Sequence, residues 1–413
     1  MTLLIKNIKG LVQADSTPPT RKEGKAMAEL PIIENAWVLC EHDRIKDFGT
    51  MDTLPAIEAD DTIDARDRYV MPAFVDSHTH IIFPASRETE FVDKIKGLSY
   101  AEIAAKGGGI LNSANKMQDA SEEELYFSAM RRIREVTSTG TGTIEIKSGY
   151  GLSLEAELKM LRVAKMIRQN SPLQVKTTFL GAHAIPKKYE NRRDYIDLVI
   201  NEMLPAVAEE KLADYCDVFC EQGFFSESET EEIIQAGLRY GMKPKIHANQ
   251  LHVSGGVQVG VRNQAVSVDH LESMGEAEIE VLKGAATMPV TLPGAAFFLR
   301  MPYTPARQII DAGLGLALAT DYNPGSAPCG SMPLMIALAC VQMRMTPEEA
   351  INAATINAAY ALEMQDELGT ITAGKRANLI VTREIPSLAY IPYAFGSPVV
   401  ETTILNGHVV YQR

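Results

Sequence analysis

Residues 71–80 read MPAFVDSHTH, an apolar run that ends in two histidines. His78 and His80 are two positions apart, so on a strand both side chains point to the same face. Two imidazoles on one face can share a metal ion at bond lengths of about 2.0–2.1 Å. This stretch therefore predicts a buried strand that carries half of a metal site at its end.

Seven more short apolar runs that end in polar residues follow. Helix-like stretches at residues 154–168, 192–209 and 227–240 lie between them. Eight strand–helix repeats fit a (β/α)8 TIM-type barrel, which typically takes about 250 residues. A doubly wound open sheet is the alternative, but no glycine-rich phosphate loop follows the first strand. The expected strands are residues 73–76, 143–147, 176–180, 217–221, 243–247, 265–270, 285–290 and 315–320.

Both ends of the chain have a different, strand-rich pattern. Residues 41–43 separate two strand-like runs, and Asn406-Gly407 between two apolar runs is the strongest hairpin signal in the chain. These patterns predict a small β-sandwich domain built from both termini. We expect that domain to comprise residues 1–70 and 366–413, and the barrel residues 71–365.

The composition bounds the possible functions. The chain has 413 residues, and its 40 basic against 53 acidic side chains give a net charge of −13, which disfavours nucleic-acid or anionic membrane partners. No apolar run of about 18 residues predicts a membrane span, and no signal peptide is recognised. Five scattered cysteines indicate reduced thiols. We expect a cytoplasmic protein that acts on a small molecule.

Most of the histidines fall where strands are expected to end. The carboxyl ends of barrel strands converge on one site, and Asp321 follows a very apolar run in which a buried carboxylate needs a partner or a cation. A single strand-end histidine is more often an ordinary hydrogen-bonding group, but several together favour a metal site. The strand-end histidines are His78, His80, His183, His247 and His270, and the predicted ligands are His78, His80, His247 and Asp321.

These residues carry a family resemblance. Residues 71–80 are similar to the first-strand signature of the amidohydrolase superfamily. Residues 86–91 (SRETEF), 146–152 (IKSGYGL), 180–186 (LGAHAIP), 268–272 (VDHLE) and 319–326 (ATDYNPGS) resemble the imidazolonepropionase family more specifically. The resemblance spans essentially the whole chain. It implies a homodimer that hydrolyses the cyclic amide 4-imidazolone-5-propanoate to N-formimidoyl-L-glutamate in histidine degradation, with one zinc or iron ion per chain.

The resemblance also implies roles for individual residues. The implied metal ligands are His78, His80, His247 and Asp321. The substrate would be bound by Arg87, Tyr150 and His183. The glutamate part of the product would be held by Asn323, Gly325 and Ser326.

Each role has its own chemical reason. Metal-bound hydroxide attacks the ring carbonyl, and His183 or His270 stabilises the oxyanion. Asp321 carries the proton to the leaving nitrogen. Arg87 can grip the propanoate unless it pairs with Glu88 or Glu90, and the backbone N–H groups of the turn at residues 323–326 could hold a carboxylate.

Two departures from relatives bear on the mechanism. Gln250 stands three positions after His247, where many members of the family carry an acid. An amide can orient the substrate but cannot accept a proton, so we assign the base to Asp321, assisted by His270. Binuclear relatives have a carboxylated lysine at the end of the fourth strand. Here residues 219–222 read FCEQ and Lys147 lies on the second strand, which predicts a single ion.

Two other functions compete with this one. Another cyclic-amide hydrolase or aminohydrolase of the superfamily would share the ligands but would not need Arg87, Tyr150 and the turn at residues 323–326. A non-catalytic assembly protein on the same scaffold typically loses metal ligands, and all four are present here.

Overall fold

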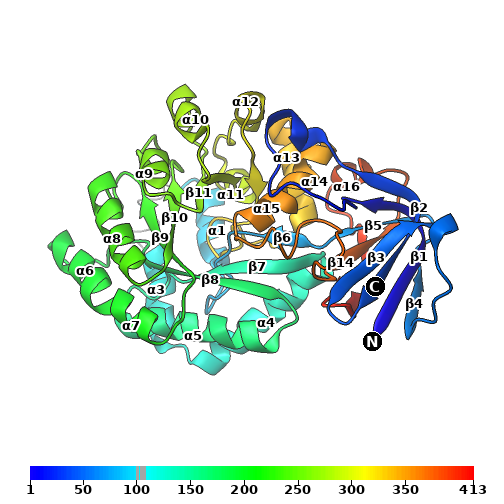
Figure 1. The fold of residues 1–413 in the computed structure, drawn as a ribbon. Coiled ribbons are helices and arrows are strands. Elements are labelled where there is room, and N and C mark those ends of the chain that lie inside the picture. Colours follow the sequence, from blue (N-terminus) through cyan, green and yellow to red (C-terminus); the bar gives the residue numbers. More distant parts are fainter. Residues whose placement is uncertain (99–101, 103–107) are drawn as a thin grey trace.

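The computed structural model describes residues 1–98, 102 and 108–413. Its centre is a barrel of eight parallel strands that pair in chain order, with helices around the outside (Figure 1). All eight predicted strands are present, with shifts of a few residues at their ends. They are β6 (Phe74–Asp76), β7 (Thr141–Lys147), β8 (Gln174–Ala182), β9 (Tyr215–Cys220), β10 (Lys243–Ala248), β11 (Ser267–His270), β12 (Met288–Thr291) and β13 (Ala317–Leu318).

Backbone hydrogen bonds just beyond β6 and β13 close the barrel. The N–H of Asp321 donates to the carbonyl of His78 at 3.0 Å, and that of His80 donates to Tyr322 at 2.9 Å. An open sheet leaves its two edge strands unpaired. The barrel prediction is therefore confirmed, and the doubly wound alternative is wrong.

The helices lie between successive strands and follow the predicted pattern with one exception. The stretch predicted at residues 192–209 is interrupted by a π-helical turn, η3 (Val199–Met203). Pro205 lies two residues after this turn and lacks the N–H that would continue the α-helical bonding. The α-helices are α1 (Glu88–Ile95), α3 (Ile110–Asp119), α4 (Glu122–Ser138), α5 (Leu154–Asn170), α6 (Arg192–Leu198), α7 (Leu204–Glu209), α8 (Glu227–Arg239), α9 (Gly256–Arg262), α10 (Glu276–Leu282), α11 (Pro293–Leu299), α12 (Ala306–Asp311), α13 (Met332–Met343), α14 (Pro347–Ala353), α15 (Ile356–Tyr360) and α16 (Tyr390–Tyr393), and the 3-10 helices are η1 (Gly24–Ala28) and η2 (Met51–Thr53). Among the described residues, none of the helices combines the length and apolarity that crossing a membrane requires.

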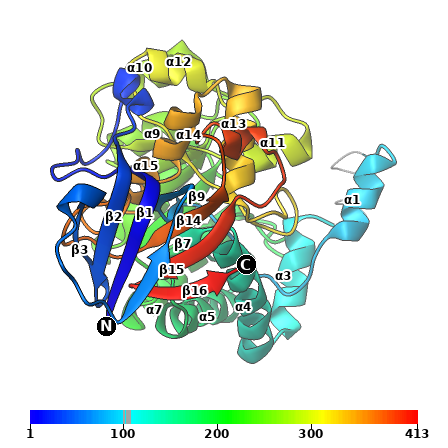
Figure 2. The same cartoon turned by 90° about the vertical axis from the view of Figure 1, so that its right-hand side faces the viewer.

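Strands from both termini form a separate mixed sheet, seen face-on in Figure 2. β14 pairs antiparallel with β5, which joins the two ends of the chain. Asn406 and Gly407 have φ values of 52° and 76°, as the predicted hairpin turn requires. The predicted unit from both termini is thus confirmed, while its boundaries at residues 70 and 366 stay a prediction. Its strands are β1 (Thr2–Val12), β2 (Ile32–Glu41), β3 (Arg44–Thr50), β4 (Asp61–Asp64), β5 (Arg68–Pro72), β14 (Leu379–Glu384), β15 (Val400–Leu405) and β16 (His408–Gln412).

Candidate active site

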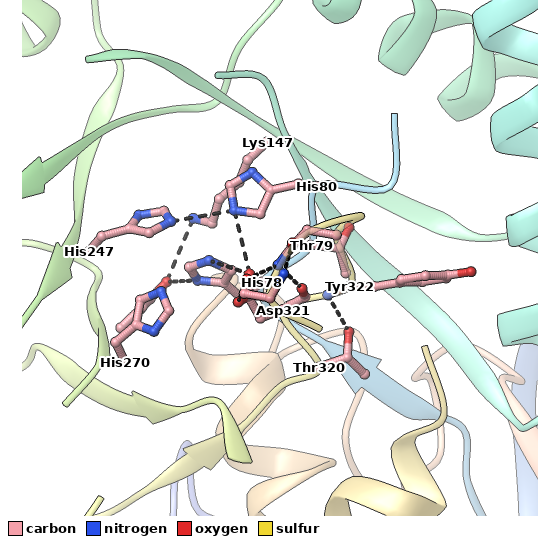
Figure 3. Close-up of polar contacts among 12 residues, drawn as sticks. His78, Thr79, His80, Lys147, His247, His270, Thr320, Asp321 and Tyr322 are labelled. Carbon is pink, nitrogen blue, oxygen red and sulfur yellow. Dashed lines mark hydrogen bonds and ion pairs between the residues drawn. The ribbon is translucent and has the colours of Figure 1, made fainter. Parts of the chain in front are cut away.

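The four predicted metal ligands meet at the carboxyl ends of the barrel strands. His78 and His80 follow β6, His247 lies in β10 and Asp321 follows β13. Asp321 Oδ1 is 3.7 Å from His78 Nε2 and 3.6 Å from His80 Nε2, and His247 Nε2 is 3.4 Å from His80 Nε2. Figure 3 shows these side chains pointing toward one another, with His270 beside them.

This arrangement fits a metal ion. Ligands arranged tetrahedrally at bond lengths near 2.1 Å stand about 3.4 Å apart, close to the spacing observed here. His78 Nε2 is buried and has no hydrogen-bond partner among the described residues. Burial and neighbouring cationic groups hold the pKa of His78 well below its usual value, and burial with nearby histidines does the same for the pKa of His80. Neutral imidazoles are the form that binds a metal.

Two carboxylates orient two of these imidazoles from behind. His78 Nδ1 is 2.6 Å from Asp269 Oδ2, and His247 Nδ1 is 2.9 Å from Asp217 Oδ2. Because the Nδ1 atom of each ring faces a carboxylate, the Nε2 atom of each ring is left to face the centre. We did not predict these aspartates. Their only signal in the sequence was a charged residue inside an otherwise apolar strand.

The remaining predicted residues surround one cavity of about 550 Å³ above the ligands. Among the predicted residues only His78 is absent from its lining, since it lies fully buried behind the others. The structure thus brings together residues that are up to 246 positions apart, from His80 to Ser326. The predicted residues in the lining are His80, Arg87, Tyr150, His183, His247, Gln250, His270, Asp321, Asn323, Gly325 and Ser326.

Two basic side chains lie at one end of this cavity. Arg87 pairs with Glu90 through Nε and Nη2, both 2.9 Å from Oε2, as the competing sequence interpretation anticipated. Its Nη1 atom packs against Gly325, where even a Cβ would lie only 2.2 Å away. Lys94, which we did not predict, donates to the carbonyl of Gly325 at 3.4 Å. Its position seven residues after Arg87, two turns along the helix, was the available signal.

The turn at residues 323–326 is closed by hydrogen bonds of its own. Asn323 Oδ1 accepts hydrogen bonds from the N–H groups of Gly325 and Ser326, both at 2.8 Å. Without a ligand, these two N–H groups are engaged by the turn itself, and their predicted role in holding a carboxylate stays a prediction. Ser326 Oγ instead donates to Asp321 Oδ2 at 3.2 Å, which links the turn to the metal ligands.

His183 stacks on His80 with the ring centroids 5.3 Å apart, and Tyr150 packs against both rings. His183 Nδ1 lies 3.0 Å from the carbonyl of Gly149. A carbonyl only accepts, so Nδ1 carries the proton and Nε2 of the neutral ring is an acceptor. Burial lowers the pKa of His183 to about 3, so the ring is neutral near pH 7.

His270 lies at the end of β11 and has an unusual backbone conformation, with φ of 87°. Its Nδ1 atom is 3.3 Å from Glu272 Oε1. Burial lowers the pKa of His270, but the carboxylates of Glu272, Asp321 and Asp269 together more than offset this, so the net pKa is raised. Asp321 also has a positive φ, of 55°. Such strained residues concentrate at functional sites, and here they turn both side chains toward the cavity.

Comparisons with known proteins show the family of this chain. Residues 69–410 match the model of the amidohydrolase family. The chain is 57% identical to the imidazolonepropionase of Christiangramia forsetii and 56% identical to that of Flavobacterium johnsoniae, in each case over 99% of this chain and 100% of the relative. A solved triazine hydrolase variant shares the fold, with a TM-score of 0.77 at 15% identity over 100% of this chain and 95% of that one. The chain therefore belongs to the amidohydrolase family and, within it, to the imidazolonepropionases.

Proposed function

We propose that this chain hydrolyses 4-imidazolone-5-propanoate to N-formimidoyl-L-glutamate, a step of histidine degradation. One observation carries the proposal: a cavity with a His/His/His/Asp cluster at its floor has two cationic side chains at one end. Such a cavity suits a small cyclic amide with a carboxylate tail. The relatives named imidazolonepropionase support the same reaction.

The cationic end accounts for binding of the propanoate. Arg87 Nη1 is the guanidinium nitrogen that Glu90 does not hold, and Lys94 adds a second positive charge nearby. Charge-assisted hydrogen bonds of this kind fix a carboxylate and thereby the distance from the tail to the ring. The substrate ring then lies toward His183, whose Nε2 accepts a ring N–H.

The bond changes are those of amide hydrolysis. The oxygen of water bonds to the ring carbonyl carbon, the carbon–nitrogen bond of the ring breaks, and the nitrogen leaves with a proton. Asp321 accepts the proton of the attacking water and passes it to that nitrogen. His270, held by Glu272, donates to the oxyanion. We withdraw the oxyanion role from His183, because its Nε2 atom accepts rather than donates.

We infer one metal ion per chain, zinc or iron, on His78, His80, His247 and Asp321. When bound there, the ion supplies Lewis acidity and acidifies a coordinated water. Two features of the chain support a single ion. β9, the fourth strand of the barrel, contains no lysine, and Lys147 on β7 is engaged by Glu145 and Asp217, each at 2.8 Å.

We further propose a cytoplasmic homodimer. All five cysteines are free, as expected of reduced thiols.

Large apolar side chains are exposed on and beside the neighbouring helices α13 and α16, with Val341 68% and Tyr393 81% exposed. Light scattering of the purified protein tests the dimer, because a monomer at micromolar concentration contradicts it.

The deciding experiment is anaerobic ultraviolet monitoring of 4-imidazolone-5-propanoate with the wild type beside Asp321→Ala, with metal content measured on the same samples. We expect substrate loss that depends on the metal and disappears in the variant. Bound metal without turnover would refute the proposed substrate and direct the search to other cyclic amides.

A further inference from the structure

A cluster of charged side chains lies inside the barrel beneath the metal-binding residues, and the reaction proposed above does not use it. Two ammonium groups and three carboxylates form it, and all five side chains are fully buried. Burying so many charges is costly unless each is paired. The members are Glu145, Lys147, Asp217, Lys245 and Asp269.

Lys147 is the central member of this cluster. Its Nζ atom is 2.8 Å from Glu145 Oε1, 2.8 Å from Asp217 Oδ2 and 3.6 Å from Asp269 Oδ2. These contacts join three strands of the barrel, β7, β9 and β11. The lysine therefore fixes the relative positions of two aspartates that come from different strands.

The same two aspartate oxygens hold the metal-binding imidazoles. Asp217 Oδ2 contacts both Lys147 Nζ and His247 Nδ1, and Asp269 Oδ2 contacts both Lys147 Nζ and His78 Nδ1. Two chains of contacts thus run from one ammonium group to two different histidines. Asp217 also accepts a hydrogen bond from the backbone N–H of His247 at 3.1 Å, which limits its freedom to move.

We propose that Lys147 is a positioning residue that holds His78 and His247 in metal-binding geometry through Asp269 and Asp217. The inference rests on the metal site proposed above. It adds a further layer of residues behind that site, because no hydrogen bond or ion pair among the described residues joins the lysine side chain to a metal ligand, and the lysine does not line the cavity. Groups that orient metal ligands typically contribute about 10- to 100-fold to metal affinity.

Lys245 provides a matched control within the same cluster. It is equally buried, and its Nζ atom pairs with Glu145 Oε2 at 2.5 Å and with the carbonyl of Ser77 at 3.2 Å. In the described part of the chain, no hydrogen bond or ion pair joins it to Asp217 or Asp269, and it acts on Asp269 through its charge alone. Lys245→Met thus removes the same charge from the same buried cluster without breaking either chain of contacts to the histidines.

The test compares Zn²⁺ binding to full-length wild type, Lys147→Met, Lys147→Gln and Lys245→Met. Each protein is stripped of metal, and its Zn²⁺ dissociation constant is measured by competition with a chromophoric chelator. We expect a loss of about 10- to 100-fold in affinity for Lys147→Met, a smaller loss for Lys147→Gln, which keeps an N–H donor, and less than about tenfold for Lys245→Met. The visible spectrum of the Co²⁺-loaded proteins should change only for the Lys147 variants.

Three results would overturn the proposal: equal losses at both lysines, unchanged Zn²⁺ affinity in Lys147→Met, or Lys147 variants that fail to fold beside a folded Lys245→Met. The last would show that the lysine serves the fold rather than the histidines. If the wild type itself binds no Zn²⁺, the proposed metal site fails first, so the two failures are distinguishable.

Discussion

Gly325 provides a sharp test of how this protein recognises its substrate. A Cβ at this position would lie 2.2 Å from Arg87 Nη1 and 2.4 Å from Arg87 Cζ. Non-bonded contacts are normally about 3.5–4.0 Å, so the guanidinium must move by on the order of 1 Å in Gly325→Ala. The φ of Gly325 is outside the left-handed region, so alanine introduces no backbone strain. The fold should survive, because the atoms that yield are the end of a flexible side chain.

The displacement should cost substrate binding. A hydrogen bond to a charged group contributes about 1.5–3 kcal/mol. Each 1.4 kcal/mol is roughly a factor of ten in rate or affinity, so kcat/KM for 4-imidazolone-5-propanoate should fall by about 10- to 100-fold. Most of the loss should appear in KM, since the propanoate is held equally in the ground state and the transition state.

Steady-state kinetics of Gly325→Ala in the wild-type and Arg87→Met backgrounds, beside one control variant, isolate this effect. Gly275→Ala is the control, because Gly275 lies outside the cavity with φ of −128° and, among the described residues, its Cβ would meet only Glu278 Oε2, at 3.3 Å. Arg87→Met removes the guanidinium, so Gly325→Ala should have no further effect when added to it. The reasoning is refuted if Gly325→Ala keeps wild-type kcat/KM, or if its loss is the same with and without Arg87.

Three other predictions follow from the site and its surroundings. Removal of metal with a chelator should abolish hydrolysis and lower the Tm, because an ion that binds only the folded state stabilises it. Adding Zn²⁺ or Fe²⁺ to the stripped protein identifies the active ion. If neither ion restores hydrolysis, the metal site is contradicted. Gln250→Ala should raise KM more than it lowers kcat, since the amide orients the ring without carrying a proton, and stopped-flow traces that show a large loss of the chemical step would contradict this. Burial lowers the pKa of Lys375 to about 8 from 10.5, so between these values the unfolded chain binds more protons and the free energy of unfolding rises with pH. Urea denaturation of Lys375→Met should show a flatter rise of this free energy over pH 8–10. An unchanged slope would refute the lowered pKa of Lys375.

The fold was predictable from the sequence because strand–helix alternation is a local pattern. Each barrel strand is a short apolar run that its own residues reveal. The errors lie at the ends of the elements. The last strand was expected at residues 315–320, yet β13 spans only Ala317–Leu318, because the chain turns there to bring Asp321 toward the centre. The π-helical turn before Pro205 was missed although the proline was a visible signal.

The site was predictable only in part. The ligands could be found because parallel strands end at one face of the barrel, so residues that follow them converge. Hydrogen bonding within the turn at residues 323–326 could not be foreseen, since whether Asn323 points inward or outward depends on packing rather than on sequence spacing. The role of His183 was likewise ambiguous, because its tautomer depends on the carbonyl of Gly149.

The charged cluster beneath the site lies beyond any local pattern. Lys147 and its two aspartate partners are 70 and 122 positions apart in the sequence, and only closure of the barrel brings them together. Taken alone, each of these charged residues only interrupts an otherwise apolar strand. Together they place two positive charges among three negative ones in a fully buried position, and the Oδ2 atoms of Asp217 and Asp269 that face Lys147 also contact the histidines. The barrel core therefore supports the site through ion pairs as well as apolar packing, and removal of the Lys147 charge should weaken metal binding before it affects substrate binding.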